Sequence, residues 1–245
     1  MEYDAEKITP YGSGESKTGQ VRRMFDNIAT VYDVMDHAMS LGLDKRWRRK
    51  AAKIVAKSEP KTILDMATGT GDFALALRRN VASVRSITGV DISPGMIEVA
   101  KQKLEAAGAD VTLVVGDGMR LPFGDGSFDA VTVAFGVRNF ESLEKGIAEM
   151  ARTLASGGTL CIIELTLPTN PVIKPLYKLY TRLVIPAGGK MVARDRRAYA
   201  YLPHSIEAMP QGEEMLDIIR RAGLEQCKCR CLTMGVCAIY TAIKP

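Results

Sequence analysis

The chain has 245 residues, 47% of them hydrophobic, and a formal net charge of +5. This length and composition indicate one folded domain with a full apolar core. No apolar run approaches the roughly 20 residues that a helix needs to cross a bilayer, and the polar N-terminus does not resemble a signal peptide. A modest positive charge, without interleaved aromatic and basic residues, argues against a nucleic-acid partner. We therefore expect a soluble, cytoplasmic protein.

The chain is predicted to be a polar tail followed by a single domain. Residues 1–20 are expected to be flexible, and the domain occupies residues 21–245. Residues 61–165 alternate between strand and helix patterns, which implies a parallel sheet with helices on both faces. The other predicted parts of the domain are a helical cap over 21–58, a helical insertion or lid over 166–210, and a helix with a hairpin over 211–245.

The predicted elements follow one another in that order. Within the alternating region, strands are predicted over 61–66, 85–90, 111–115, 128–134 and 159–165, and helices over 72–80, 95–107 and 142–155. A helix over 212–222 and strands over 224–231 and 235–243 follow. The turn between the last two strands is too short for a crossover, so they must pair antiparallel. The sequence thus predicts an α/β, Rossmann-like fold with a mostly parallel seven-stranded sheet and a C-terminal antiparallel hairpin.

The most informative motif is the glycine loop after the first predicted strand. Gly69 and Gly71 let the backbone turn tightly and approach a ligand closely. Asp91 ends the second predicted strand, where a carboxylate can accept hydrogen bonds from ribose hydroxyls. This layout predicts a nucleotide site. The pattern G-x-G-x-x-A by itself also fits a dinucleotide, as in an NAD(P)-dependent oxidoreductase.

Charge favours S-adenosylmethionine (SAM) over a dinucleotide. Asp65 precedes the loop and Asp72 begins the next helix, and two carboxylates there would repel a pyrophosphate but suit a sulfonium and an ammonium group. Asp117, followed by Gly118, adds an acid after the third predicted strand, placed to accept from an adenine amino group. No metal site is expected, because the cysteines near the C-terminus alternate and lack a C-x-x-C spacing. A SAM-binding protein without activity is a further alternative.

The predicted lid carries a basic amphipathic segment. Residues 172–185 are mainly apolar, and their basic residues recur every four positions on one helical face. Either this face is a solvated surface, or the segment contacts lipid or a hydrophobic ligand. The basic residues are Lys174, Lys178 and Arg182 within the segment, and Arg194, Arg196 and Arg197 after it.

Several blocks of the sequence carry a resemblance to a known family. They are Tyr32-Asp33-Val34-Met35-Asp36, Ser40-Leu41-Gly42, Arg46-Trp47-Arg48, Phe135-Gly136-Val137-Arg138-Asn139-Phe140, and Arg152-Thr153-Leu154 with Gly157-Gly158 and Glu164. From about Phe25 to its C-terminus, the chain resembles the ubiquinone/menaquinone biosynthesis C-methyltransferases. It departs from them at Asp36-His37, where they usually have Asn-Asp. It also departs at Asp44, where they usually have a His, and at Ala134, where they often have a Ser.

The resemblance implies a class I SAM-dependent methyltransferase. Besides Asp65, Gly69 and Gly71 of the glycine loop, it places SAM contacts at Thr70, Asp91, Asp117, Gly118 and near Ala134. The implied reaction methylates a ring carbon of a prenylated hydroquinone such as demethylmenaquinol. The open alternatives are the benzoquinol intermediate of ubiquinone biosynthesis and another phenolic or sterol-like acceptor.

The candidate catalytic residues follow from the need to make the ring carbon electron-rich. A phenol has a pKa near ~10, so a cation must stabilise the phenolate, and Arg138 lies just after the fourth predicted strand, where such sheets bind ligands. Asn139 would orient a water or hydroxyl, and Tyr32 would position the ring. The resemblance further implies that Asp117 joins them in a proton relay. An insoluble prenyl tail further implies peripheral contact with the inner face of a membrane. A homodimer is left open.

Overall fold

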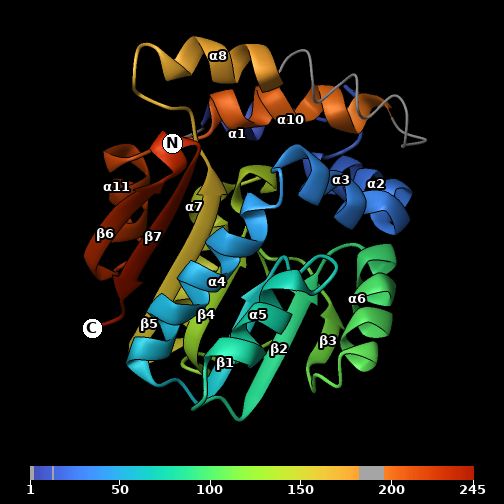
Figure 1. Ribbon diagram of the computed structural model, residues 1–245. Helices are drawn as coiled ribbons and strands as arrows, with labels where there is room; N and C mark the ends of the chain where they lie inside the picture. The colour runs from blue at the N-terminus through green and yellow to red at the C-terminus, as the bar shows by residue number, and fades with distance from the viewer. Residues whose placement is uncertain (1–2, 13, 182–195) are drawn as a thin grey trace.

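One seven-stranded sheet organises the protein, with the order β3-β2-β1-β4-β5-β7-β6 (Figure 1). The computed structural model describes residues 3–12, 14–181 and 196–245. Strands β1 to β5 are parallel, whereas β7 pairs antiparallel with both β5 and β6. This confirms the predicted fold class. The strands are β1 (Thr62–Met66), β2 (Ser86–Asp91), β3 (Thr112–Val115), β4 (Phe128–Ala134), β5 (Leu154–Leu165), β6 (Glu225–Leu232) and β7 (Cys237–Ile243).

Helices cover both faces of the sheet, which explains why its central strands are apolar without alternation. Along β5, Leu160 and Ile162 pack on one side in a core with α7 and α11, while Cys161 and Ile163 pack on the other with α4 and α5. Burial raises the pKa of Cys161 to about 12, which keeps this thiol neutral in the core. The helices are α4 (Leu43–Val55), α5 (Asp72–Asn80), α6 (Pro94–Ala106), α7 (Leu143–Thr153) and α11 (Glu213–Arg221).

A second group of helices lies over the carboxyl ends of the parallel strands (Figure 1). It joins the N-terminal segment to the region between β5 and α11 through a separate apolar cluster that includes Met24, Met35, Ala198 and Tyr201. Its members are α1 (Asp4–Lys7), α2 (Lys17–Ile28), η1 (Ala29–Val31), α3 (Tyr32–Met39), α8 (Ile173–Leu179) and α10 (Arg196–Ala208). The sheet edge where ligands bind in such folds is therefore roofed.

The N-terminal tail is the clearest departure from the prediction. Tyr3 is 8% exposed, and its hydroxyl donates a hydrogen bond to Glu144 Oε1 at 3.0 Å. Lys17 is buried, and its ammonium group donates to the backbone carbonyls of Ala5 and Arg138. The described part of the segment over 1–20, which we predicted to be flexible, thus packs against the core through long-range contacts that its polar composition did not indicate.

Burial lowers the pKa of Lys17 to about 8. The ammonium ion is accordingly held by carbonyl oxygens and by nearby acidic residues rather than by water. Because one of those carbonyls belongs to Arg138, the N-terminal segment helps to fix the backbone of a candidate catalytic residue.

The lid is only partly described. Helix α8 covers the first half of the predicted amphipathic segment, whereas Arg182 and Arg194 lie outside the described residues. Among the residues that are described, no helix is long and apolar enough to cross a bilayer.

Candidate active site

Two adjoining cavities lie between the sheet and its roof. The smaller has a volume of about 80 Å³ and is lined by the loops after β1 to β4. The larger, of about 260 Å³, lies between α2, α3, α8 and α10. Four residues line both cavities: Phe25, Tyr32, Phe135 and Asn139. A group bound in one cavity therefore lies next to a group bound in the other.

Asp91 is an acid of the smaller cavity whose side chain is fixed by backbone hydrogen bonds. It ends β2, and its carboxylate accepts hydrogen bonds from the backbone N–H of Gly69 at 2.8 Å and of Ser93 at 2.9 Å. Each oxygen keeps a free lone pair, because a carboxylate oxygen accepts more than once. Burial raises the pKa of Asp91 to about 6, against the effect of those two N–H groups. Asp91 can therefore accept from a vicinal diol while it closes the glycine loop.

The loop after β3 supplies the next contacts. The carboxylate of Asp117 accepts from the backbone N–H of Met119 at 2.9 Å, and Gly118 lies beside it along the cavity wall. A Cβ at Gly118 would lie 3.3 Å from the methyl carbon of Met66. A side chain here would crowd the cavity, so glycine keeps the wall open.

The loops after β1 and β4 meet at the shared end of the cavities. Ala67 and Phe135 both have left-handed backbone conformations, with φ of 50° and 60°, which non-glycine residues adopt at a cost. A Cβ at Gly136 would lie 2.6 Å from the Cβ of Ala67, so only glycine permits this approach. Such strain is concentrated at binding sites, and both strained residues line the smaller cavity.

Some residues that we predicted to bind the cofactor do not line this cavity. Asp65 is fully buried, and its carboxylate accepts from the hydroxyls of Thr68 at 2.7 Å and Thr132 at 2.8 Å. Gly71 caps α5 in a left-handed conformation. The Thr70 hydroxyl donates to Asp33 and accepts from Lys103. The structure thus brings Gly69, Asp91, Asp117, Gly118 and Ala134 together at the cavity, and places Asp65, Thr70 and Gly71 behind it.

The charge argument based on Asp65 and Asp72 is therefore not supported in its original form. The Asp72 carboxylate lies 2.8 Å from the ammonium group of Lys103, and Asp72 is not among the residues that line the cavity. The acids that do line the cavity are Asp91, Asp117 and Glu141. The cavity remains acidic, which suits a positively charged cofactor, but its acidity comes from other carboxylates than the two on which the sequence argument relied.

A buried ionic cluster joins α3 to the core. The Arg48 guanidinium bonds to Asp44, lies 2.8 Å from Asp36 and 3.8 Å from Asp72. His37 Nδ1 lies 2.8 Å from Asp44, so a His–Asp pair exists here although the residue types at these positions depart from the resembled family. Ligand atoms of Asp36, His37, Asp44 and Asp72 lie within 4.8 Å of one another. Arg48 and Lys103 already pair with these acids, so the cluster is an ion-pair network.

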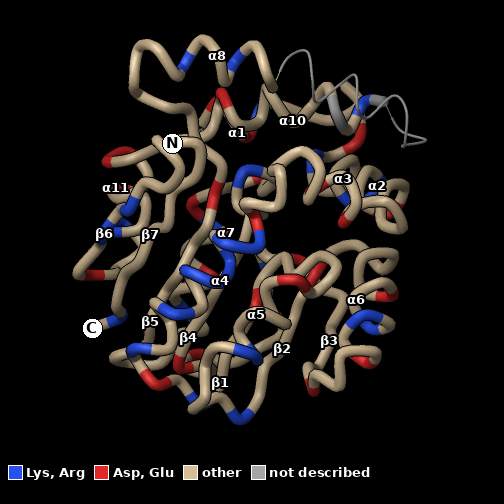
Figure 2. The backbone as a smooth tube through the Cα atoms, viewed as in Figure 1, with Lys and Arg blue, Asp and Glu red and all other residues tan. Residues whose placement is uncertain are grey.

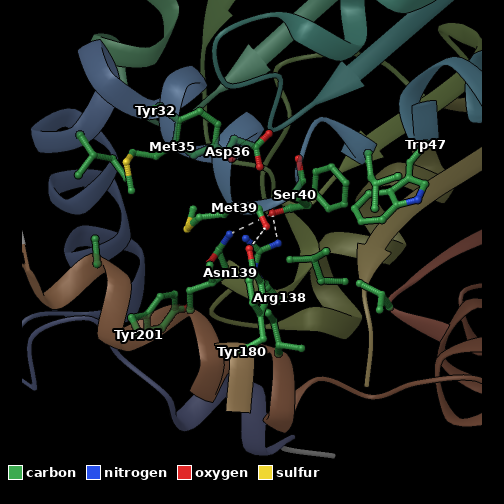
Figure 3. Close-up of a pocket in the computed structure, with 18 of the residues that line it drawn as sticks. Tyr32, Met35, Asp36, Met39, Ser40, Trp47, Arg138, Asn139, Tyr180 and Tyr201 are labelled. Atoms are coloured by element: carbon green, nitrogen blue, oxygen red, sulfur yellow. Dashed lines mark hydrogen bonds between the residues drawn. The ribbon is translucent and has the colours of Figure 1, made fainter. Parts of the chain in front are cut away.

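The larger cavity is mostly apolar. Its polar side chains include Asp36, Ser40, Arg138 and Asn139, and the part around Arg138 and Asn139 is here called its polar end (Figure 3). Arg138 is 6% exposed and pairs with the buried Glu164, with 2.6 Å between Nη1 and Oε1. Its guanidinium also donates to the backbone carbonyl of Phe135. Asn139 donates weakly to the same carbonyl, at 3.4 Å. These contacts fix both side chains at the boundary between the cavities.

Tyrosines surround this polar end. Tyr32 comes from α3, Tyr177 from α8 and Tyr201 from α10, and all three line the larger cavity. Burial raises the pKa of each hydroxyl, while the charge of Arg138 opposes the shift. The three hydroxyls are therefore neutral and lie within electrostatic reach of Arg138. Tyr177 and Tyr201 were not predicted as site residues, because nothing in their sequence surroundings distinguishes them from core tyrosines.

The sheet order, the antiparallel β7 and the acidic cavity after β1 to β3 define a class I SAM-dependent methyltransferase. Solved structures support the fold. The chain superposes on a SAM-dependent methyltransferase from Thermotoga maritima with a TM-score of 0.61 at 20% identity, over 91% of this chain and 99% of the other. It superposes on the methyltransferase bound to the Trm112 activator of Haloferax volcanii with a TM-score of 0.63 at 20% identity, over 90% and 97%.

The chain belongs to the ubiE/COQ5 methyltransferase family, whose model matches residues 13–244. It is 46% identical to the demethylmenaquinone methyltransferase of Bacteroides fragilis over the full length of both chains. It is 43% identical to the demethylmenaquinone methyltransferase of Porphyromonas gingivalis over 98% of both. The predicted family and the enzyme class are confirmed.

The residues that line the smaller cavity suit the SAM that the family uses. Asp91 offers free lone pairs for ribose hydroxyls, and Asp117 with the adjacent backbone suits an adenine edge. Glycines at 69, 116 and 118 let the backbone approach a ligand closely and leave the cavity free of side chains at these positions. When bound, SAM supplies an electrophilic methyl group, and the shared wall of Phe25, Tyr32, Phe135 and Asn139 separates its cavity from the larger one.

Proposed function

We propose that the chain methylates a ring carbon of a prenylated naphthoquinol, demethylmenaquinol, with SAM as methyl donor. The names of its full-length relatives support this acceptor. The observation that carries it is the larger cavity, which is mostly apolar but has Arg138 and Asn139 among its polar residues, and which adjoins the cofactor cavity. A ring with polar oxygens and a hydrocarbon tail matches that distribution.

The residues at the polar end would activate the ring. Arg138 remains charged at all working pH values, and its salt bridge to Glu164 holds the guanidinium in a buried position. A fixed donor in such a site stabilises a developing oxyanion more effectively than water does. Arg138 would thus favour the phenolate form of the ring, whose adjacent carbon is the nucleophile.

Asn139 and Tyr32 would position the reacting groups, because they line both cavities. Asn139 would orient the ring hydroxyl or a water that takes its proton. Tyr32 would set the ring against the donor methyl. Asp117 lines only the cofactor cavity, so we propose that it binds the cofactor and that the ring proton leaves through the water that Asn139 orients.

The test is methylation of a short-tailed demethylmenaquinol by the purified protein with SAM, followed by mass spectrometry. We expect a single added methyl on the unsubstituted ring carbon next to the carbon that bears the prenyl tail. We expect no product when the corresponding monocyclic benzoquinol is supplied. Methylation of the benzoquinol alone would overturn the proposed acceptor. Binding of SAM without transfer to either ring would overturn the enzymatic proposal.

We further propose that the roof of the larger cavity rests on a lipid bilayer. In α8 and at the two residues that flank it, Tyr177 and Tyr180 line the cavity, while Val172, Leu176 and Leu179 face solvent with exposed fractions of 68%, 63% and 57%. Leu41, which also lines the cavity, is 80% exposed. A helix that packs only on its own core would turn its apolar side chains inward. Those of α8 do not all do so.

Charge and substrate chemistry agree with this orientation. The only charged residues of α8 are Lys174 and Lys178, as Figure 2 shows in blue, and basic residues beside an exposed apolar face suit anionic headgroups. A prenyl tail is stored in the bilayer. A cavity that opens among exposed leucines would let the ring enter while the tail stays in lipid.

Replacing Leu176 with Glu is expected to weaken binding to vesicles of phosphatidylethanolamine and phosphatidylglycerol at least tenfold in co-sedimentation. Burying one leucine contributes about 1.5–3 kcal/mol, which corresponds to about a tenfold or larger change in affinity. Val115→Glu is the matched control. Val115 is half exposed at β3, the sheet edge opposite β6, and its replacement should leave vesicle binding unchanged. Equal losses in both variants would contradict the proposed face.

A further inference from the structure

Three polar atoms at the larger cavity have no hydrogen-bond partner among the described residues. They are Arg138 Nε, Asn139 Oδ1 and the Tyr201 hydroxyl. Their residues are 6%, 7% and 5% exposed, and all of them line the cavity (Figure 3). An unpaired buried polar group destabilises a protein, so such groups are normally paired, and each unpaired one calls for an explanation. Three around one cavity indicate a ligand with matching polar atoms.

The orientation of the Asn139 amide decides what it offers. Its Nδ2 donates to the Phe135 carbonyl at 3.4 Å, and a flipped amide would set two oxygens against each other. The unpaired atom is therefore the carbonyl oxygen Oδ1, which only accepts hydrogen bonds. It needs a donor from the ligand.

The other two atoms offer hydrogens. Arg138 Nε always carries a hydrogen. Tyr201 lies on α10, which packs against the short helix η3 (Val137–Asn139) that carries Arg138 and Asn139. Its hydroxyl is neutral, because burial raises its pKa. The site thus presents two donors and one obligatory acceptor.

This set matches the reduced form of the proposed acceptor and mismatches the oxidised form. A hydroquinol has two oxygens that accept hydrogen bonds and that also carry protons to donate. The corresponding quinone has two carbonyl oxygens that only accept. It would leave Asn139 Oδ1 buried against another acceptor, at a cost comparable to a lost hydrogen bond.

We propose that Arg138 Nε, Asn139 Oδ1 and the Tyr201 hydroxyl together select the quinol over the quinone, with Tyr201 as a further ring-binding residue. The inference rests on the proposed function and deepens it. Asn139 distinguishes the oxidation states, because its Oδ1 is the only one of the three unpaired atoms that requires a donor. Tyr201 and Arg138 hold ring oxygens in either state.

The chain contains its own probe for the test. Trp47 is the only tryptophan and lines the larger cavity, with its Nε1 donating to Thr233 at 2.9 Å. Its fluorescence is titrated, without oxygen, with a 1,4-naphthoquinone carrying a two-isoprene tail and separately with the dithionite-reduced naphthoquinol. We expect the wild type to bind the quinol about tenfold more tightly, the factor expected from one hydrogen bond.

The variants separate the roles. Asn139→Leu should weaken quinol binding and leave quinone binding unchanged, so the preference disappears. Tyr201→Phe should weaken both forms by similar factors and preserve the preference. Tyr180→Phe is the matched control for the preference, because the Tyr180 hydroxyl already donates to the Met39 carbonyl at 2.7 Å. Circular dichroism would confirm that each variant is folded.

The outcomes distinguish this inference from the proposed function. Failure of the wild type to bind or methylate either ring would overturn the proposed function. Methylation with equal affinity for quinol and quinone would overturn only the selection. The same holds if Asn139→Leu keeps the preference, or if Tyr201→Phe changes neither affinity, since the unpaired atoms would then hold water rather than the ring.

Discussion

Replacing Arg138 with Ala is expected to lower kcat for ring methylation by about 10²–10³, the usual effect of removing one preorganised donor from an oxyanion. The affinity for SAM should be unchanged, because Arg138 lines the larger cavity and not the smaller one. Single-turnover methylation measures the first quantity and calorimetric titration with SAM the second. A parallel fall in SAM affinity would show that Arg138 supports the fold of the cofactor site instead of the chemistry.

The single substitution leaves Glu164 as an unpaired buried carboxylate, which destabilises a protein by about 3–5 kcal/mol. The control is therefore the double variant Arg138→Met with Glu164→Leu, in which the buried pair is replaced by apolar side chains of similar size. Such replacements are close to neutral for stability. We expect this double variant to melt near the wild-type temperature and still to be inactive. Recovery of activity with recovery of stability would assign Arg138 a purely structural role.

The sheet was predictable because its signals are local. Buried parallel strands read as apolar runs, and helix α5 begins and ends at the predicted residues, Asp72 and Asn80. Strand β5 begins earlier than predicted, at Leu154, where it pairs with Phe128. The prediction missed this start because the segment after α7 is polar and glycine-rich. The packed N-terminal segment was not predictable, since Tyr3 and Lys17 find partners far away in sequence.

The candidate site divides along the same line. Asp91 and Asp117 follow strand ends, so the topology of the sheet alone brings them to one edge. The roles of Asp65 and Asp72 depend instead on side-chain neighbours, Thr132 and Lys103, from other elements. Tyr201 belongs to the lid, and its approach to Arg138 depends on how α10 packs on η3, which no periodicity in the sequence encodes.

Asp91→Asn is expected to raise the Kd for SAM by about 100-fold. The substitution removes the charge that makes hydrogen bonds to ribose hydroxyls strong, each about 1.5–3 kcal/mol, and sets an amide NH₂ against a backbone N–H. Asp129→Asn is the matched control. The Asp129 carboxylate also accepts from two backbone N–H groups, of Lys61 and Thr62, but it lies at the start of β4, the opposite end of the sheet. Calorimetry should find unchanged SAM affinity in that variant.

The pH dependence of SAM binding tests the same carboxylate without a substitution. Burial raises the pKa of Asp91 to about 6, so the side chain is ionised at pH 8 and gains a proton as the pH falls through 6. A protonated carboxyl is a weaker acceptor, and the Kd for SAM should therefore rise as the pH falls, by about tenfold between pH 7 and pH 5. In Asp91→Asn this dependence should disappear, because the amide does not titrate. A slope that persists in the variant would assign the proton to another group of the cavity.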